Sequence, residues 1–267
     1  MLSLLKRKFP SENFLYYGDN DNAPYGSKSE RQLLFITMKN LDYILSFGIK
    51  AIVVACNTLS AAVLSDIRYY SGKKTFGVFP PVHKCIMRNE KTLLLSTPLT
   101  AEKYITTPGL YILSLPDLAS EIEANAFNLR NIDLTEVLSR GYLYVPEDEF
   151  LSGNYKKRSA STIFDHRKIP FNFRVSEYKF AFDAIICGCT HYSLIKKQIF
   201  DHLGPAKIIC GEDYTIDLMN QCREIIKTSG NYCENEILFV GKNARFNERI
   251  YREVVSAAEN MVKKFEK

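Results

Sequence analysis

Ala51-Ile-Val-Val-Ala-Cys56-Asn-Thr-Leu-Ser60 decides the fold, because a second stretch of the chain repeats its pattern. That second stretch is Ala184-Ile-Ile-Cys-Gly-Cys189-Thr-His-Tyr-Ser193. In both, an apolar run typical of a buried strand ends in a small residue, a cysteine and polar residues, and helix-like sequence follows. Two copies of one strand–turn–helix unit predict two similar lobes with a site between them.

Strand-like runs alternate with helix-like runs along the rest of the chain. A helix over Ser27–Phe47 carries apolar residues on one face, and Ser27 and Glu30 have the spacing of a capping box. A second helix is expected over Thr58–Ser71. The expected strands are Phe14–Tyr17, Ile49–Ala55, Thr75–Phe79, Thr92–Ser96, Gly109–Leu113, Asp183–Cys187, Lys207–Ile209 and Glu236–Val240. This alternation predicts an α/β protein of two pseudo-symmetric lobes, each a mainly parallel sheet flanked by helices, with the active site in the cleft between them.

The first lobe is expected to be discontinuous in sequence. Residues 1–90 together with 206–267 are predicted to form it, and residues 91–205 are predicted to form the second lobe. Within the second lobe, Gly141–Tyr178 has scattered aromatic and basic residues and no sustained period, so it is interpreted as an insertion. Its role as a flap, an oligomer contact or a mobile loop stays open, and a homodimer is the candidate assembly.

Composition excludes several classes of protein. The 267 residues are 46% hydrophobic and 24% charged, which is typical of a soluble globular protein with its own core. The net charge of +5 is carried partly by short, separated basic groups such as Lys6–Lys8 and Lys156–Arg158, which argues against a nucleic-acid-binding face. No apolar run reaches the roughly 20 residues that span a bilayer, and no secretory signal opens the chain. We therefore expect a cytoplasmic protein with neither a nucleic-acid nor a membrane partner.

Cys56 and Cys189 are each expected where a buried strand ends and a helix begins. Ligands bind outside the carboxyl ends of parallel strands, and free N–H groups at a helix start should lower a thiol pKa from about 8.5 toward neutrality. If the lobes face each other, one thiolate can remove a proton from a carbon while the opposite thiol returns one from the other side. That exchange inverts a stereocentre and requires no metal or organic cofactor.

Neighbouring polar residues support this chemistry. Asn57, Thr58 and Thr190 offer hydrogen bonds beside the two thiols, and His191 can poise Cys189 by exchanging a proton with it. The remaining cysteines are expected only to pack, and they are Cys85, Cys187, Cys210, Cys222 and Cys233. A zinc site is not expected, because the chain has no second cluster with Cys-x-x-Cys or His-x-x-x-His spacing.

Three ordered motifs resemble those of the glutamate racemase family. Ala55-Cys-Asn-Thr58 and Gly188-Cys-Thr-His-Tyr192 resemble the two cysteine motifs of that family. Tyr17-Gly-Asp19 followed by Ala23-Pro-Tyr-Gly-Ser-Lys28 resembles its third motif, and weaker similarity continues through Thr97-Pro-Leu-Thr100. The resemblance implies cofactor-independent interconversion of L- and D-glutamate, which supplies D-glutamate for peptidoglycan.

The resemblance also implies roles for single residues. Cys56 and Cys189 match the catalytic pair, and His191 matches the residue that assists the second cysteine. The residues that match substrate contacts are Tyr25, Gly26, Asn57, Thr58, Thr190 and Glu123, with Glu121 as the alternative to Glu123. Among them, Tyr25 and Gly26 match the loop that receives the side-chain carboxylate of glutamate.

The chain departs from the family at its start. Family members begin with a strand ending in Asp-Ser-Gly, whose Asp assists the first cysteine, and Met1 stands where that motif should already have passed. A further segment upstream is therefore expected. Two alternatives stay open: a non-catalytic amino-acid-binding relative of the fold, and a racemase for another amino acid such as aspartate. Aspartate racemases tend to have Glu at the position of His191, which favours glutamate.

Overall fold

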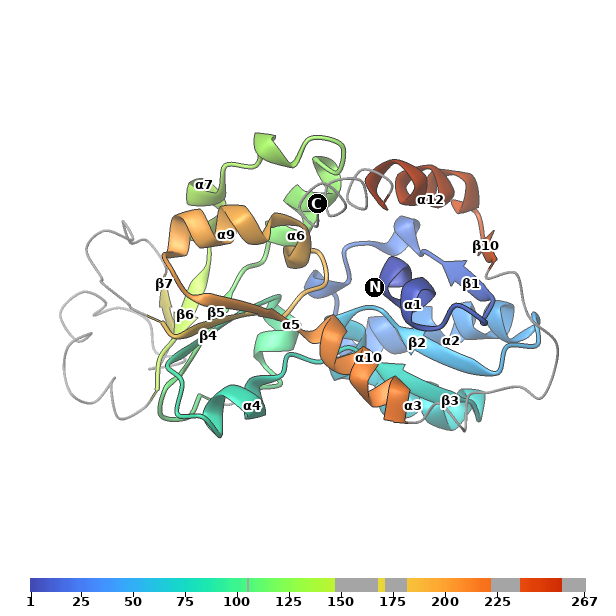
Figure 1. Ribbon diagram of the computed structural model, residues 1–267, viewed down its shortest axis with the longest axis horizontal. Helices are drawn as coiled ribbons and strands as arrows, with labels where there is room; N and C mark the ends of the chain where they lie inside the picture. The colour runs from blue at the N-terminus through green and yellow to red at the C-terminus, as the bar shows by residue number, and fades with distance from the viewer. Residues whose placement is uncertain (105, 147–167, 171–181, 222–235, 256–267) are drawn as a thin grey trace.

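The protein consists of two lobes that lie side by side (Figure 1). The computed structural model describes residues 1–104, 106–146, 168–170, 182–221 and 236–255. Its strands are β1 (Phe14–Tyr17), β2 (Ala51–Val54), β3 (Lys74–Gly77), β4 (Thr92–Ser96), β5 (Leu110–Ser114), β6 (Tyr142–Tyr144), β7 (Lys168–Pro170), β8 (Ala184–Cys187), β9 (Lys207–Cys210) and β10 (Ile237–Val240). Every strand expected from the sequence is present, with small shifts at its ends.

Helices connect most of these strands. They are α1 (Leu2–Lys8), α2 (Glu30–Leu45), α3 (Asn57–Ser71), α4 (Val82–Ile86), α5 (Pro98–Ala101), α6 (Leu118–Ala124), α7 (Leu134–Ser139), α9 (Lys196–Leu203), α10 (Gly211–Gln221) and α12 (Ala244–Ile250). Short 3-10 helices include η2 (Tyr25–Ser27) and η5 (Tyr192–Ile195). Within the described residues, none of the helices combines the length and the apolarity that crossing a bilayer demands.

The second lobe is built on a six-stranded sheet with the order β7-β6-β5-β4-β8-β9. The four strands β5, β4, β8 and β9 run parallel to one another. All residues of β4, β5 and β8 are buried, as expected for continuous apolar strands covered on both faces. Helices α6, α7 and α9 pack on one face of this sheet and α4 and α5 on the other (Figure 1). The predicted α/β class is confirmed.

Two strands of this sheet were not predicted from the sequence. β6 and β7 both fall within Gly141–Tyr178, and they pair antiparallel with Leu143 opposite Ile169. Each has only three residues, which is too short to display the alternation that reveals a strand. The remainder of this stretch from residue 147 onward, apart from β7, lies outside the described residues.

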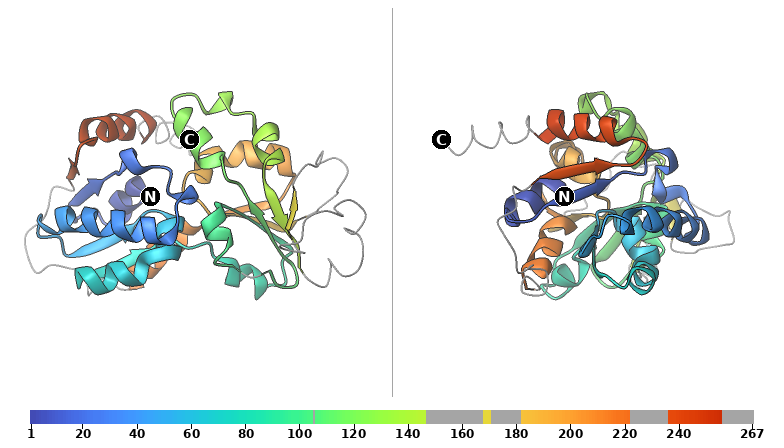
Figure 2. Two further views of the ribbon diagram at one scale, coloured as in Figure 1. Left: turned by 180° about the vertical axis from the view of Figure 1, so that it is seen from behind. Right: turned by 90° about the vertical axis from the view of Figure 1, so that its right-hand side faces the viewer.

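The parallel sheet of the first lobe is divided into two pairs of strands. β1 pairs with β10 and β2 pairs with β3, and no described strand joins one pair to the other. All four residues of β1 and three of the four in β2 are only partly buried, in contrast to the strands of the second lobe. Figures 1 and 2 show β10 and α12 on the β1 side of this lobe, with β3 and α3 on its opposite side.

β9 lies in the sheet of the second lobe, although the predicted boundary at residue 206 assigns it to the first. Its residue Cys210 is directly opposite Cys187 of β8. The chain returns to the first lobe with α10, which contacts α1 and β3. The predicted boundary therefore differs from the structure by one strand, because the pairing partner of an edge strand is not encoded in its own pattern.

Helix α2 begins at Glu30, so the capping box predicted at Ser27 and Glu30 is wrong. Ser29 is the N-cap: its side chain accepts a hydrogen bond from the N–H of Gln32, and its own N–H donates to the Gln32 side chain. Ser27 belongs instead to the 3-10 helix η2. The two candidate capping boxes, Ser27 with Glu30 and Ser29 with Gln32, lie two residues apart. The backbone of the preceding loop determines which serine becomes the N-cap of α2.

Candidate active site

Cys56 lies at the carboxyl end of β2 and occupies the N-cap position of α3. Its backbone is extended, and no side-chain hydrogen bond from Cys56 caps the helix. The residue as a whole is partly exposed. This is the strand-to-helix position predicted from the sequence, at the end of a parallel strand where ligands bind.

The pKa of Cys56 departs from the expected direction. Enclosure of the sulfur raises the pKa to about 11, the negative charge of Cys189 also raises it, and the N–H groups of Leu59 and Thr58 lower it. The expected shift toward neutrality is therefore wrong for Cys56, because loss of hydration outweighs the helix N-terminus. In the ligand-free protein Cys56 is a neutral thiol at pH 7.

Cys189 lies in the turn after β8 and is buried. Its Sγ lies 3.6 Å from Nδ1 of His191, and Nε2 of His191 lies 3.0 Å from Oε1 of Glu123 on α6. Burial lowers the pKa of His191, but hydrogen bonds to Cys189 and Glu123 raise it, and the net result is a pKa of about 10. At pH 7 the histidine is thus a cation between a sulfur and a carboxylate, placed to exchange a proton with Cys189.

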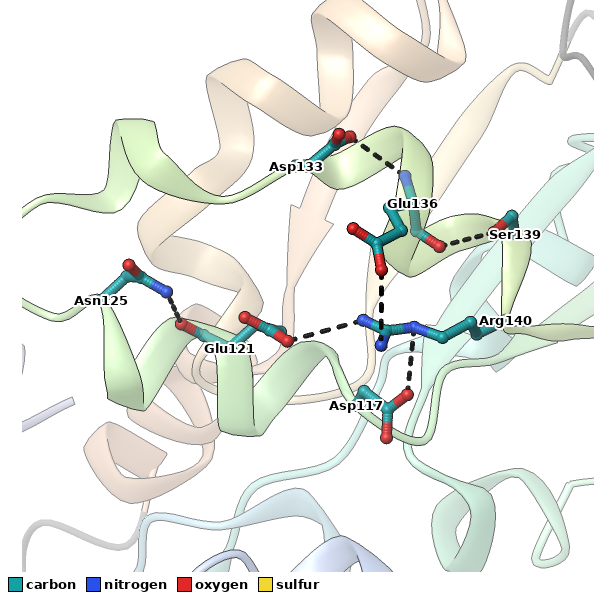
Figure 3. A network of polar contacts seen from close by, with 7 residues as sticks. All are labelled: Asp117, Glu121, Asn125, Asp133, Glu136, Ser139 and Arg140. Carbon is teal, nitrogen blue, oxygen red and sulfur yellow. Dashed lines mark hydrogen bonds and ion pairs between the residues drawn. The ribbon is translucent and has the colours of Figure 1, made fainter.

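Helix α6 distinguishes the two candidate glutamates. Glu123 contacts the histidine, whereas Oε1 of Glu121 lies 3.5 Å from Arg140 (Figure 3). The guanidinium of Arg140 also lies 3.3 Å from Asp117 and 3.8 Å from Glu136 (Figure 3). Glu121 therefore belongs to an ion-pair cluster that ties α6 to α7, and of the two glutamates it is Glu123 that contacts His191.

The segments that carry the two cysteines meet directly. The hydroxyl of Thr190 donates a hydrogen bond of 3.2 Å to the carbonyl oxygen of Ala55. The residue after Cys189 is therefore bonded to the residue before Cys56. The charge of Cys189 acts on the pKa of Cys56, so the two sulfurs also lie within electrostatic range of each other. The structure thus brings together the two thiol segments, which come from different sheets.

Three buried threonines form a hydrogen-bonded ring beside Cys56. The hydroxyls of Thr58 and Thr97 are 2.9 Å apart, that of Thr97 donates to Thr100 (3.1 Å), and that of Thr100 donates to Thr58 (3.3 Å). Gly26 packs on this ring, and a Cβ at Gly26 would lie 2.7 Å from Thr97. The sequence indicated Thr97 and Thr100 only as weak similarity, although a Thr-x-x-Thr directly after a strand end is a usable signal.

Asn57 has a buried amide with no internal partner. The residue is 2% exposed, and among the residues that the structure describes neither its side-chain oxygen nor its nitrogen has a hydrogen-bond partner. An unsatisfied buried polar group costs roughly 1–3 kcal/mol. A polar ligand that bonds to this amide would remove that cost, which supports the predicted role of Asn57 in binding.

Tyr25 lies in η2 at the centre of a polar network. Its hydroxyl donates a 2.7 Å hydrogen bond to Oδ2 of Asp19. Asp19 also accepts hydrogen bonds from Asn22 and Asn40, and Asn40 in turn accepts one from Tyr17. The motif Tyr17-Gly-Asp19 was recognised in the sequence, but no role was predicted for Asp19 itself.

The other described cysteines stay out of the site. Cys85, Cys187 and Cys210 are buried as predicted, and Cys187 lies opposite Cys210 on the neighbouring strand. Cys222 and Cys233 lie outside the described residues. No group of three His, Cys, Asp or Glu side chains in the described part of the chain is arranged to hold a metal ion.

Gly188 sets the position of Cys189. A Cβ at Gly188 would lie 2.6 Å from the carbonyl oxygen of Leu95, to which the Gly188 N–H already donates a 2.7 Å hydrogen bond. Because backbone of β4 cannot move aside as a side chain can, we expect Gly188→Ala to lower the free energy of unfolding by about 2–3 kcal/mol. Urea unfolding of both proteins measures the difference, and an unchanged midpoint would show that the turn has room for the methyl group.

Comparison with known proteins identifies the family, although no protein-family model matches the chain. The glutamate racemase of Clostridium botulinum strain Okra is 30% identical over 265 residues, which cover 95% of this chain and 90% of that protein. The chain belongs to the glutamate racemase family. The family predicted from three short motifs is thereby confirmed.

Solved glutamate racemases share the fold of this family member. Isoform RacE1 from Bacillus anthracis superposes with a TM-score of 0.64 at 20% identity, covering 95% of this chain and 88% of that one. The glutamate racemase of Francisella tularensis, solved with D-glutamate, gives 0.61 at 19% identity, with coverage of 93% and 86%. These likenesses extend over nearly the whole chain and confirm the predicted two-lobed α/β architecture of a glutamate racemase.

Proposed function

We propose that this member of the glutamate racemase family interconverts L- and D-glutamate, with Cys56 and Cys189 as opposed acid/base groups. The hydrogen bond between Thr190 and Ala55 carries the proposal, because it joins the segments on which the two thiols lie. A racemase needs two proton-transferring groups on opposite sides of one carbon, and this contact supplies the proximity that such a pair requires.

The proposed reaction needs one thiol as the acid and the other as the base. Cys56 is a neutral thiol at pH 7, and the imidazolium of His191 lies beside Cys189. The enantiomer whose α-hydrogen faces Cys189 loses it to the Cys189 sulfur, and the carbanion receives a proton from Cys56. The reverse reaction begins with the opposite protonation state, so the thiols exchange roles with each turnover.

Polar groups around the thiols suit an amino acid that carries two carboxylates. The unsatisfied amide of Asn57 is available to the α-carboxylate group. The hydroxyl of Thr190 donates its proton to Ala55, so its oxygen remains as an acceptor for the α-ammonium group. Thr58 contributes through the threonine ring, and Tyr25 with Gly26 forms the loop proposed to receive the distal carboxylate. Glu123 acts through its hydrogen bond to the histidine. All proton transfers are assigned to side chains of this chain.

The test follows optical rotation after either L- or D-glutamate is mixed with the purified protein. We expect both solutions to approach zero rotation, since the two enantiomers have equal free energies. A panel with aspartate and alanine distinguishes a racemase for another amino acid. Heat released on glutamate binding, without any change in rotation, would identify the non-catalytic alternative instead.

The biological role proposed for the product is supply of D-glutamate for peptidoglycan. Expression of this chain in a bacterium that requires external D-glutamate tests that role, and growth without the supplement is the expected result. Failure of growth together with racemisation in vitro would separate the role in the cell from the chemistry.

A further inference from the structure

We propose that Cys187 and Cys210 form a reversible disulfide when the protein meets hydrogen peroxide, so that the ends of β8 and β9 are a redox-sensitive modification site. Neither cysteine belongs to the acid/base machinery, and the cross-link itself does not depend on the function proposed above. Only its effect on turnover rests on that function, because Cys187 lies two residues before Cys189.

The two cysteines lie opposite each other on neighbouring strands. Cys187 is the last residue of β8 and Cys210 the last residue of β9, and the parallel register pairs them directly. Neighbouring strands lie about 4.8 Å apart, and the Cα atoms of a disulfide usually lie about 4.4–6.8 Å apart. The backbone therefore already has the spacing that a disulfide requires.

Both thiols also lie on the same face of the sheet. Cys187 and Cys210 pack in the apolar cluster that α6, α7 and α9 cover. Ile186 and Ile209, the residues just before them, pack on the opposite face. Because side chains alternate along a strand, this arrangement places the two sulfurs side by side under the same helices.

The surroundings of Cys210 favour its thiolate. The adjoining Cys187 lowers the pKa of Cys210, burial and the charge of Glu212 raise it, and Lys196 at the start of α9 lowers it, with a net decrease. Cys210 and burial raise the pKa of Cys187, which therefore keeps its proton. The pair thus combines a thiolate that can attack an oxidant with a thiol that can resolve the product.

The position of β9 exposes the pair to a small oxidant from one side. β9 is the edge strand of the six-stranded sheet, and its other three residues are exposed or only partly buried. Cys210 itself is 5% exposed, whereas Cys187 on the inner strand is 1% exposed. We therefore expect peroxide to reach Cys210 first, with the second sulfur directly behind it.

The oxidation consumes one molecule of hydrogen peroxide. The Cys210 sulfur attacks one peroxide oxygen, the O–O bond breaks, and the departing oxygen takes up a proton and leaves as water, so that a sulfenic acid remains. The Cys187 sulfur then displaces the hydroxyl group, which leaves as water with the thiol proton as the S–S bond forms. Each sulfur gives one electron to the peroxide oxygens. Two thiols and one peroxide thus yield one disulfide and two water molecules.

Closing this bond should disturb the catalytic turn, because an S–S bond is only about 2.05 Å long and draws the two strand ends together. The next residue, Gly188, is held: its N–H donates a 2.7 Å hydrogen bond to the carbonyl oxygen of Leu95. Movement of Cys187 is therefore transmitted to Cys189, whose sulfur lies 3.6 Å from His191. A displacement of about 1 Å in a catalytic group can cost about 100-fold in rate, so racemisation should fall.

The test treats the folded wild-type protein with hydrogen peroxide, blocks the remaining thiols with N-ethylmaleimide in denaturant, and maps the non-reduced tryptic peptides by mass spectrometry. We expect the peptide 180–196 to be linked to the peptide 208–223. Fragment ions should place the bond between Cys187 and Cys210, not at Cys189 or Cys222, which lie in the same two peptides. Dithiothreitol added before blocking should remove the linked pair.

Cys222→Ala is the matched control, since it removes the other cysteine of the Cys210 peptide, and it should form the linked pair as the wild type does. Cys210→Ala should not form it. Absence of the pair from the treated wild type would overturn the proposal, and so would its persistence in Cys210→Ala or a bond located at Cys189.

A racemisation assay measures the consequence for turnover. The treated wild type should lose about tenfold or more of its rate and regain it with dithiothreitol, whereas Cys210→Ala should lose less. Equal loss in the two proteins would overturn the effect of the disulfide on the catalytic turn. If the untreated chain did not racemise glutamate, the two-thiol function would fail, whereas the linked peptides would still decide the modification.

Discussion

Replacing Cys56 or Cys189 by alanine is expected to lower kcat/KM for glutamate racemisation by about 10³-fold or more. Each thiol serves one side of the α-carbon, and no other described acid/base side chain in the site replaces it there. Cys85→Ala is the control, because this buried thiol packs on the opposite face of the second-lobe sheet from Cys189. Optical rotation measured from both enantiomers gives the rates, and retained turnover in either single-thiol protein would refute the mechanism.

The single-thiol proteins should also separate the two half-reactions. In deuterated water, Cys189→Ala should exchange the α-hydrogen of only one enantiomer, the one that faces Cys56. Cys56→Ala should exchange that of the other enantiomer. NMR of recovered glutamate measures the exchange, and washout from the same enantiomer in both variants would place the two thiols on one side of the carbon.

The second large effect is expected from His191→Asn, with kcat/KM falling about 10²-fold. The fall must be equal in both directions, because the equilibrium constant between enantiomers is one and fixes the ratio of the two kcat/KM values. The individual kcat values can differ, because Cys189 accepts a proton in one direction and donates it in the other. His202→Asn is the control, since this exposed histidine on α9 lies within hydrogen-bond distance of a backbone carbonyl of its own helix.

The pH profile distinguishes a proton-exchanging histidine from a structural one. The pKa of His191 is raised to about 10, so the imidazolium is present below that pH and is lost as the pH rises through it. Racemisation by the wild type should therefore decline as pH rises through about 10, and His191→Asn should lack this step. Glu123→Gln removes a charge that raises the pKa, so the decline should move to lower pH. A profile identical in all three proteins would contradict the role given to His191.

The sequence was sufficient to predict elements whose signal is local. Continuous apolar runs predicted β4, β5 and β8. The repeated strand-cysteine-helix unit predicted the position of Cys56 at the start of α3, whereas Cys189 lies in a turn and the 3-10 helix η5 begins only at Tyr192. Long-range pairing was less accessible: β9 lies in the other lobe from the one predicted, and β6 and β7 were too short to show a period. The capping box was misplaced by two residues, because Ser27 and Ser29 both have suitable partners three residues later.

In the candidate site, too, the sequence predicted what depends on local motifs and missed what depends on the packing of distant segments. Motif spacing identified the cysteines, the histidine and Asn57, but burial decides their chemistry. The pKa of Cys56 is raised by enclosure of its sulfur, which no pattern of residue types reveals. Likewise, the sequence left both Glu121 and Glu123 as candidates. In the fold, Arg140 forms an ion pair with Glu121, whereas Glu123 contacts His191.

The bond from Thr190 to Ala55 has a consequence for how an amino acid enters and leaves. A hinge motion that parts the lobes must break this bond and draw the sulfurs away from each other at the same moment. In the proposed two-thiol mechanism, proton delivery from both sides is then confined to the closed form, so a carbanion exists only while its second proton donor is within reach. In that mechanism, closure of the lobes on the substrate also brings the two thiols together, which suppresses escape of a half-reacted intermediate.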